Sequence, residues 1–239
     1  MQQKCILVVD DQAEVANVCR RALEKEGYQV LVACNSEEAM QHCRRDRPDL
    51  VIMDIVMPEM DGIELCQLLR TALGLSGLPF LFLSGKHDIT DKAAAYGVGA
   101  DDYLTKPFDV RELTMRVRAL LRRTKPSWGD TKPRELTVGD LRLDCRAFRL
   151  TTPQKTVALT PVEFDLLYYL MSYPGEVQPS DKLLQNVWGY PPGTRSDVVR
   201  THMKNLRDKI ESAGSPPRHI RTVGHHGYMI SAEPEQWRA

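Results

Sequence analysis

The chain has 239 residues, 42% of them hydrophobic and 27% charged, which is typical of a globular protein with one large or two ordinary domains. No apolar run reaches about 18 residues, so we expect no membrane span. The first residues, MQQKCILVVDDQ, lack the features of a signal peptide, and we expect a cytoplasmic protein.

The net charge of zero is unevenly distributed along the chain. Residues 1–123 carry 16 Lys and Arg against 19 Asp and Glu, whereas residues 124–239 carry 16 against 13. An acidic half joined to a basic half indicates that the C-terminal half meets a polyanion. The six cysteines are scattered without a C-x-x-C pair, so we expect buried thiols rather than a metal or disulfide site.

In the first half, short apolar runs alternate five times with segments of helical periodicity. We predict strands over residues 5–9, 28–33, 50–53, 80–83 and 103–105, and helices over residues 14–26, 36 to near 48, 61–73, 88–96 and 109–123. This alternation predicts an α/β doubly wound, five-stranded parallel sheet.

Residues 124–135, TKPSWGDTKPRE, form a polar segment with two prolines that we interpret as a linker. Short alternating runs over residues 136–159 then predict a small antiparallel sheet. We therefore divide the chain into an N-terminal domain (1–123), a linker (124–135) and a separate α+β domain (136–239).

Three helices and a hairpin are predicted in the C-terminal domain. Thr160 is expected to cap the first helix, with Pro161 at its first position and Glu163 three residues after the cap. Ser180 is expected to cap the second helix, which continues through Trp188. A basic third helix is expected over residues 196–212, followed by a hairpin over residues 221–230.

Charged and polar side chains follow the successive strands of the first half. Asp10 and Asp11 follow the first strand, Asp54 the third, Ser84 the fourth and Lys106 the fifth. In an open parallel sheet these carboxyl ends form one edge, where ligands bind. We therefore expect the side chains to converge there, although a single such carboxylate would be interpreted as a solvated turn residue.

Three carboxylates placed together repel one another, and each raises the pKa of the others. A hard divalent cation with oxygen ligands, Mg²⁺ above all, would compensate this charge. An aspartate carboxylate can also act as a nucleophile and form an acyl phosphate. The cation and Lys106 would then neutralise the transferring phosphoryl group, and the Ser84 hydroxyl would bond one of its oxygens.

Residues 5–123 resemble the receiver domain of two-component signalling, through VVDD, DIVMPEMDG, LSG and DDYLTKPF in that order. The resemblance implies that Asp54 accepts a phosphoryl group from a sensor histidine kinase. It also implies that Asp11, Asp54 and the backbone carbonyl of Val56 bind Mg²⁺, with Asp10 acting mostly through water. Ser84 would be the switch hydroxyl, Tyr103 the switch aromatic and Lys106 the phosphoryl contact, with a cis bond between Lys106 and Pro107. A half-buried ring that only packs on the sheet is the other interpretation of Tyr103.

The predicted third helix of the C-terminal domain has one basic and one apolar face. Arg200, Lys204 and Arg207 recur at spacings of four and three, so they line one side. Such a helix can lie in a DNA major groove while its apolar side packs on its own domain. Charge alone is equally consistent with a solvated surface helix.

Residues 136–231 resemble the winged-helix effector domain of the OmpR/PhoB family, through LTPVEFDLLYYLMSYPGEV, LLQNVWGY, VVRTHMKNLRDKI, HIRTV and GY. The resemblance implies a recognition helix over residues 196–212, a hairpin wing, and binding to double-stranded DNA. The implied DNA contacts are Arg195, Arg200, Thr201, His202, Lys204, Asn205, Arg207, His225 and His226. The 188–195 loop is a candidate contact with RNA polymerase.

Two features of the chain, one in the third helix and one in the wing, depart from this family pattern. Arg200 and Thr201 stand where many relatives have Asp and Val, so base preferences do not carry over. The wing lacks the usual arginine and has His225 and His226 instead.

The same family implies a phosphorylation-dependent homodimer that binds tandem half-sites. Its receivers pair through charged residues, which here would be Lys92 with Glu112 and Asp102 with Arg116. Gly97 occupies the position of the acidic partner of Arg118, so one pair is absent.

Two alternatives to a phosphorylated transcriptional regulator remain. One is an enzyme that turns over a phospho-aspartate, such as a phosphatase of the haloacid dehalogenase type. That class has a D-x-D pattern at its first strand, whereas Asp10 and Asp11 are adjacent here. The other is a regulator that works without phosphorylation, against which the complete acidic cluster argues. We therefore expect a phosphoacceptor signalling protein rather than an enzyme.

Overall fold

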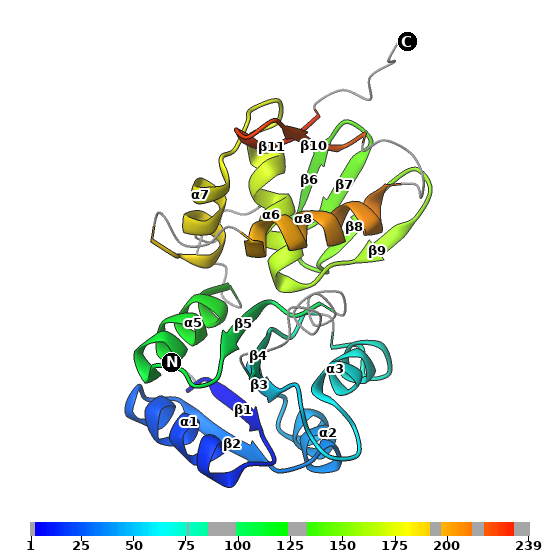
Figure 1. Ribbon diagram of the computed structural model, residues 1–239. Helices are drawn as coiled ribbons and strands as arrows, with labels where there is room; N and C mark the ends of the chain where they lie inside the picture. The colour runs from blue at the N-terminus through cyan, green and yellow to red at the C-terminus, as the bar shows by residue number, and fades with distance from the viewer. Residues whose placement is uncertain are drawn as a thin grey trace. The chain divides into compact units, whose positions relative to one another are not determined.

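The computed structural model describes residues 3–75, 77–85, 99–123, 133–191, 197–211 and 218–231. The chain divides into two compact units, Met1–Lys125 and Pro126–Ala239 (Figure 1). Residues 124–132 of the predicted linker lie outside the described residues. Within the described part of the chain, no helix is both long and apolar enough to cross a membrane.

The first unit is built on five parallel strands in the order β2-β1-β3-β4-β5, which confirms the predicted doubly wound sheet. The strands are β1 (Cys5–Val9), β2 (Gln29–Ala33), β3 (Leu50–Asp54), β4 (Phe80–Ser84) and β5 (Asp102–Thr105). The described helices are α1 (Ala13–Lys25), α2 (Ser36–Arg45), α3 (Gly62–Thr71) and α5 (Val110–Arg123). The helix predicted over residues 88–96 lies outside the described residues.

The sheet separates two hydrophobic cores, and the described helices lie in pairs on its two faces, α1 with α5 and α2 with α3 (Figure 1). Side chains along a strand point alternately to its two faces. Accordingly, Ile6 and Val8 of β1 pack beneath α1 and α5, whereas Leu7 and Val9 pack beneath α2 and α3. Burial on both faces explains why the strands are continuous apolar runs rather than alternating ones.

Side-chain caps mark the starts of α2 and α3. The Asn35 side chain accepts a 2.9 Å hydrogen bond from the backbone of Glu38 at the start of α2. Asp61 caps α3 in the same way and accepts a 2.8 Å bond from the backbone of Glu64. Such caps satisfy backbone N–H groups that have no partner within the helix. Asp61 therefore sets the direction in which the chain leaves the loop after β3.

The second unit contains the predicted antiparallel sheet, in the order β6-β7-β8-β9, and the predicted hairpin β10-β11. Its elements are β6 (Glu135–Val138), β7 (Leu141–Asp144), β8 (Arg149–Thr151), β9 (Thr156–Ala158), α6 (Pro161–Ser172), α7 (Ser180–Leu183), the π-helical turn η2 (Leu184–Trp188), α8 (Asp197–Ile210), β10 (Ile220–Val223) and β11 (Gly227–Ile230). Since β6 begins at Glu135, the sheet starts at the last residue that we assigned to the linker.

The start of α6 follows the sequence prediction, and the start of α7 does not. Thr160 and Glu163 form a reciprocal capping box at α6. The prediction that Ser180 caps the next helix is wrong, because Ser180 is the first residue of α7 and Pro179 holds the cap position without a side-chain bond. The predicted single helix through Trp188 also changes to a π-helical turn at Leu184.

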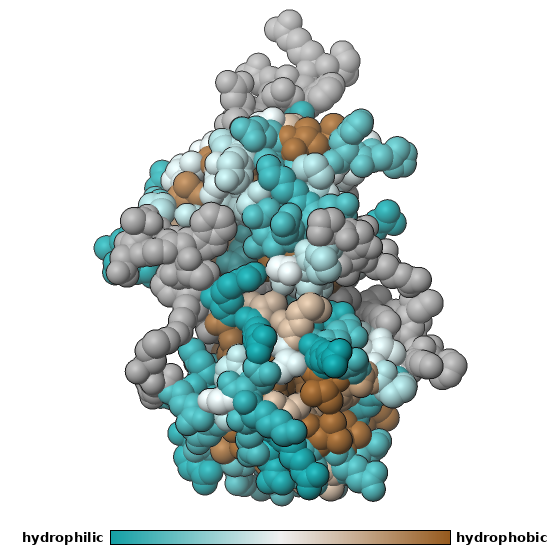
Figure 2. All heavy atoms as spheres, turned by 90° about the vertical axis from the view of Figure 1, so that its left-hand side faces the viewer, coloured by the Kyte–Doolittle hydropathy of each residue, from teal (hydrophilic) through white to brown (hydrophobic). Residues whose placement is uncertain are grey.

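The surface carries few large apolar side chains. The face seen in Figure 2 is largely hydrophilic, with apolar side chains in smaller groups among the polar ones. The exposed large apolar residues in the described part of the chain are Val18, Val56, Val110, Met115, Tyr173 and Val177.

Candidate functional site

Three carboxylates meet at the carboxyl edge of the parallel sheet, as predicted. Asp10 and Asp11 follow β1 and Asp54 ends the neighbouring β3, and their side chains offer oxygen atoms that all lie within 4.8 Å of one another. Asp10 is fully buried and Asp54 is 4% exposed, whereas Asp11 is exposed to solvent. The cluster therefore has two buried acids and one that opens to solvent.

The Lys106 ammonium binds both buried carboxylates. Its Nζ lies 2.7 Å from Asp10 Oδ2 and 2.6 Å from Asp54 Oδ2. Burial raises the pKa of Asp10, and the hydrogen bond from Lys106 only partly opposes this. Burial alone would lower the pKa of Lys106, but its bonds to the two acids outweigh burial and raise it. The bond between Lys106 and Pro107 is cis, as predicted.

The loop after β3 holds the Asp54 carboxylate in place. The backbone N–H of Val56 donates a 3.3 Å hydrogen bond to Asp54 Oδ1, while the Val56 side chain is 65% exposed. The loop closes tightly, because Gly62 donates a 2.8 Å backbone bond to Ile55. A Cβ atom at Gly62 would lie 2.1 Å from the backbone oxygen of Asp54, so only glycine fits there.

The two predicted switch residues lie on the adjoining strands. Ser84 ends β4, is 1% exposed, and its Oγ donates a 3.2 Å bond to the Gly85 carbonyl. Tyr103 lies on β5 beside Phe82 of β4. Its ring is 6% exposed and packs in the core beneath α2 and α3. Both side chains therefore adopt inward positions, and the ring is more buried than the half-buried packing that we considered.

The acidic cluster is typical of a receiver Mg²⁺ site. Carboxylate oxygens are the ligands that Mg²⁺ prefers, and this cation keeps several of its waters. An exposed Asp11 beside two buried acids suits such a partly hydrated ion. The single Lys106 ammonium faces two carboxylates, so the cluster retains negative charge that a cation would compensate.

Three of the residues predicted for a dimer surface, Asp102, Glu112 and Arg116, are paired within one chain. Arg116 NH1 lies 2.8 Å from Asp102 Oδ1, and its NH2 lies 2.6 Å from Glu112 Oε1. Arg118, which lacks the usual acidic partner, forms an ion pair with Glu26, the residue that follows α1. The other residues of this prediction, Lys92 and Gly97, lie outside the described residues.

The predicted DNA contacts separate into exposed and enclosed side chains. Arg200 and Lys204 of α8 are exposed, and so are His225 and His226 at the hairpin turn. Thr201 and Asn205 are partly exposed. Arg195 lies outside the described residues.

His202 cannot be a DNA contact in this structure, which corrects the prediction. Its side chain is fully buried, and its ring centroid lies 5.5 Å from that of Trp188. The signal was present in the sequence, since His202 follows Val198 by four residues and precedes Leu206 by four, on the apolar side of the helix.

Arg207 serves its own domain rather than standing free for DNA. Its Nε donates a 3.0 Å bond to the Ile220 carbonyl, and its NH2 donates a 2.8 Å bond to Thr222 Oγ1. The guanidinium also lies over the Tyr228 ring, 5.7 Å from the centroid. Arg207 therefore joins α8 to the hairpin, a role that the periodicity of basic residues did not indicate.

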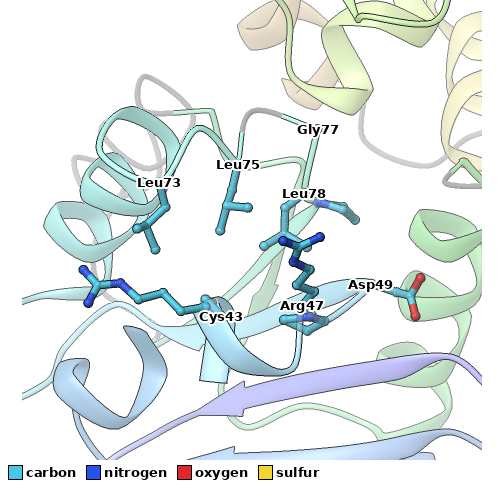
Figure 3. Close-up of a pocket in the computed structure, with 10 residues that line it drawn as sticks. Cys43, Arg47, Asp49, Leu73, Leu75, Gly77 and Leu78 are labelled. Atoms are coloured by element: carbon cyan, nitrogen blue, oxygen red, sulfur yellow. The ribbon is translucent and has the colours of Figure 1, made fainter. Parts of the chain in front are cut away.

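A cavity of about 510 Å³ lies at the opposite edge of the parallel sheet (Figure 3). Leu73, Leu75 and Leu78 form its apolar side, and Arg44 and Arg47 also line it. Asp49 and Pro79, which contribute to the wall, precede β3 and β4, whereas the acidic cluster follows β1 and β3. The cavity thus contributes no residue to the candidate site.

Two family models match the chain. The response regulator receiver domain matches residues 6–118, and the model described as transcriptional regulatory protein, C terminal, matches residues 154–230. The first contains the whole acidic cluster, and the second contains α6, α8 and the hairpin.

Two curated proteins are similar over nearly their whole length. The alkaline phosphatase synthesis transcriptional regulatory protein PhoP of Bacillus subtilis is 37% identical over 238 residues, 97% of this chain and 98% of that protein. The response regulator MprA of Mycolicibacterium vanbaalenii is 39% identical over 229 residues, 96% of this chain and 98% of that protein.

Two solved structures also resemble the chain. The response regulator DrrB of Thermotoga maritima, an OmpR/PhoB homologue, is 27% identical, with a TM-score of 0.51 over 96% of this chain and 100% of that one. A mutant of RitR is 24% identical, with a TM-score of 0.77 over 95% of this chain and 99% of that one, and supports the fold alone.

Proposed function

The chain belongs to the OmpR/PhoB family of two-component response regulators, and we propose that Asp54 is its phosphoacceptor, with phosphorylation controlling how two copies bind DNA. Members of this family are signalling transcription factors and not enzymes, so the phosphatase alternative is rejected. A receiver domain implies a histidine kinase partner, and the second domain implies DNA. Action with these two partners would take place in the cytoplasm, as the sequence predicts.

The observation that carries the proposal is the pairing of Asp54 with Lys106 at the carboxylate cluster. An Asp54 oxygen would attack the phosphorus of a phosphohistidine. A P–O bond then forms, and the P–N bond to the imidazole breaks. The Lys106 ammonium, already 2.6 Å from Asp54 Oδ2, is positioned to bind an oxygen of the incoming group.

Mg²⁺ bound by Asp11, Asp54 and the backbone carbonyl of Val56, with Asp10 acting mostly through water, would neutralise charge on the phosphoryl group. The buried Asp10 keeps the Lys106 ammonium beside the acceptor. The Ser84 hydroxyl, at the end of the adjoining strand, would turn from the Gly85 carbonyl to a phosphoryl oxygen.

Dimerisation would exchange intrachain ion pairs for interchain ones. Asp102 and Arg116 already form a pair within the chain, and the same two side chains can pair across a two-fold axis. Lys92 would pair with Glu112 in the same interface. Monomer and dimer would then be in equilibrium, and phosphorylation of Asp54 would shift this equilibrium towards the dimer.

The second domain would place α8 in the DNA major groove. Arg200 and Lys204 are its exposed cations, with Thr201 and Asn205 beside them. The exposed His225 and His226 would meet the DNA backbone from the wing. A dimer would then read tandem half-sites, and the 188–195 loop is the candidate contact with RNA polymerase.

Phosphoryl transfer from acetyl phosphate in the presence of Mg²⁺, followed by mass spectrometry, tests the acceptor. We expect one added phosphoryl group on a peptide containing Asp54, none in Asp54→Ala, and normal labelling in Asp61→Asn, which alters the cap of α3 in the same loop. A label at another residue, or none, would refute the assignment.

Gel filtration with and without beryllofluoride, together with genome-wide mapping of binding sites, tests the regulatory step. We expect a beryllofluoride-dependent dimer and the loss of most mapped sites in Asp54→Ala. A monomer under both conditions would reject phosphorylation-driven dimerisation. Unchanged site occupancy in Asp54→Ala would support the alternative of a regulator that works without phosphorylation.

A further inference from the structure

An ionic triad in the second unit has no part in the function described so far. The His219 ring lies between two carboxylates, with Nδ1 3.1 Å from Glu211 Oε2 and Nε2 2.9 Å from Asp140 Oδ1. The side chains of His219 and Glu211 are only 12% and 9% exposed. Asp140 and His219 are 79 residues apart in the sequence, so the fold alone brings the triad together.

The geometry fits a doubly protonated His219 ring. A neutral imidazole can donate from one nitrogen only, and its other nitrogen would then direct a lone pair at a carboxylate oxygen. An imidazolium donates from both nitrogens and satisfies both contacts. The other oxygen of Glu211 also acts as an acceptor, since its Oε1 receives the backbone N–H groups of His219 and Ile220 at 2.9 and 3.3 Å.

The triad connects three elements that must be aligned for DNA binding. Glu211 directly follows α8, His219 directly precedes β10, and Asp140 lies in the turn between β6 and β7. One turn before the end of α8, Arg207 bonds the Ile220 carbonyl and Thr222 of the same strand. Two contacts thus join α8 to the hairpin. Arg207 binds β10 from the last turn of α8, and His219, just before β10, binds Glu211 just after the end of α8.

We infer that His219 is a positioning residue for DNA binding, acting as an imidazolium clasp between Glu211 and Asp140 that fixes the wing relative to α8. The inference rests on the proposed DNA-binding role of α8 and the wing. Within the described residues, the charged groups in contact with the His219 ring are Glu211 and Asp140. The neighbouring Arg218 side chain is exposed, and Arg207 faces β10 rather than the ring.

The stabilisation that the clasp contributes depends on pH. Hydrogen bonding to Glu211 is the main cause that raises the pKa of His219, which burial opposes. Burial would raise the pKa of Glu211, but its bonds from His219 hold it at about 2. Because the pKa of His219 is raised in the folded state, the protonated ring stabilises the fold. This stabilisation is complete below the unfolded-state pKa of about 6.5 and is lost as the pH rises through the folded-state pKa.

Nitrogen-15 NMR of histidine-labelled full-length chain tests the clasp without DNA. We expect the titration midpoint of the His219 ring to lie above the ordinary histidine value of about 6.5, and Asp140→Asn to lower that midpoint. A His219 ring that is singly protonated at pH 6 would overturn the inference. This NMR experiment uses no DNA, so its result does not depend on whether the chain binds DNA. A failure of the clasp can therefore be told apart from a failure of the proposed function.

DNA affinity of the beryllofluoride-activated chain, measured on a duplex selected from a random library, tests the positioning role. We expect His219→Gln to bind DNA roughly 3- to 10-fold more weakly than the wild type at pH 6. In this variant the wing is no longer held relative to α8 beforehand and must be ordered when DNA binds. Its affinity should approach that of the wild type as the pH rises to 9. His42→Gln is the matched control, since His42 also bonds a carboxylate, Asp46 at 2.8 Å, but lies on α2.

The comparison between variants decides the outcome. If His219→Gln and the wild type lose affinity in parallel across this pH range, His219 does not cause the pH dependence and the clasp is rejected. If Asp140→Asn, which keeps a hydrogen-bonding group, binds like the wild type at high pH and more weakly at pH 6, the positioning role is supported. Equal affinity of all three proteins at pH 6 would also reject it.

Discussion

The Lys106→Met substitution removes the ammonium that two buried acids share, so its cost follows from the geometry. Lys106 is 17% exposed and donates to Asp10 and Asp54 at 2.7 and 2.6 Å. Hydrogen bonds to charged groups contribute about 1.5–3 kcal/mol each, and leaving a buried charge unpaired costs about 3–5 kcal/mol. We therefore expect the first unit to lose about 3–5 kcal/mol of unfolding free energy at pH 7.

The loss should depend on pH with a definite sign. Burial already raises the pKa of Asp10, and removing Lys106 will raise it further. When the pKa of a carboxyl is higher in the folded state than in the unfolded state, the folded state binds more protons. The free energy of unfolding then rises as the pH falls towards the unfolded pKa of about 3.9. The stability difference between Lys106→Met and the wild type should therefore shrink between pH 7 and pH 5.

Urea unfolding of the full chain can separate the two units. All three tryptophans lie beyond residue 123, so tryptophan fluorescence follows the second unit, while far-ultraviolet circular dichroism follows both. We expect Lys106→Met to shift the first unit's transition alone. Lys4→Met is the matched control, because the Lys4–Asp49 pair is 25% and 28% exposed and its loss should cost about 1 kcal/mol or less. Equal effects of the two variants, or no dependence on pH, would refute the reasoning.

Three further variants test particular contacts. Gly62→Ala should destabilise the first unit by about 2–3 kcal/mol in the same urea assay, because the new Cβ meets backbone, whereas Gly85→Ala, with open space around it, should cost little. Glu163→Gln keeps an acceptor for the α6 cap but removes the negative charge that Lys209 binds at 2.6 Å. Its loss should lower the unfolding free energy of the second unit by about 1–2 kcal/mol, measured by tryptophan fluorescence. Arg207→Met should cost the same unit about 1–2 kcal/mol and raise amide hydrogen exchange in β10, and an unchanged exchange rate there would contradict its role.

The acidic cluster was predictable because it depends on strand order and strand ends. Asp10, Asp54 and Lys106 each follow a short apolar run, and parallel strands bring their carboxyl ends to one edge regardless of loop detail. The same local reasoning located Thr160 as a cap, because its partner Glu163 is three residues away. Such features need only short-range pattern and topology.

The contacts that the sequence did not reveal join elements far apart in the chain. Arg207 belongs to a basic stripe, and only the packing of the hairpin shows that its guanidinium binds Ile220 and Thr222. The Asp140–His219 contact depends on how the β6–β7 turn of the antiparallel sheet meets the hairpin β10-β11. His202 is a different case, since its burial follows from helical spacing once the apolar side of α8 is traced through Val198 and Leu206.

The proposed activation by dimerisation would have to compete with ion pairs that are already made within one chain. Arg116 is bound to Asp102 and Glu112 within its own chain, and Arg118 to Glu26. Exchanging such a pair for an equivalent one across an interface changes the free energy by little, because the same charges are paired before and after the exchange. In the proposed dimer the charged residues would therefore specify which surfaces meet and in which register, while the driving force would come from burying apolar surface or from the phosphorylated state itself. A small net free energy is what a switch requires, because an equilibrium within a few kcal/mol of balance can be reversed by one phosphoryl group.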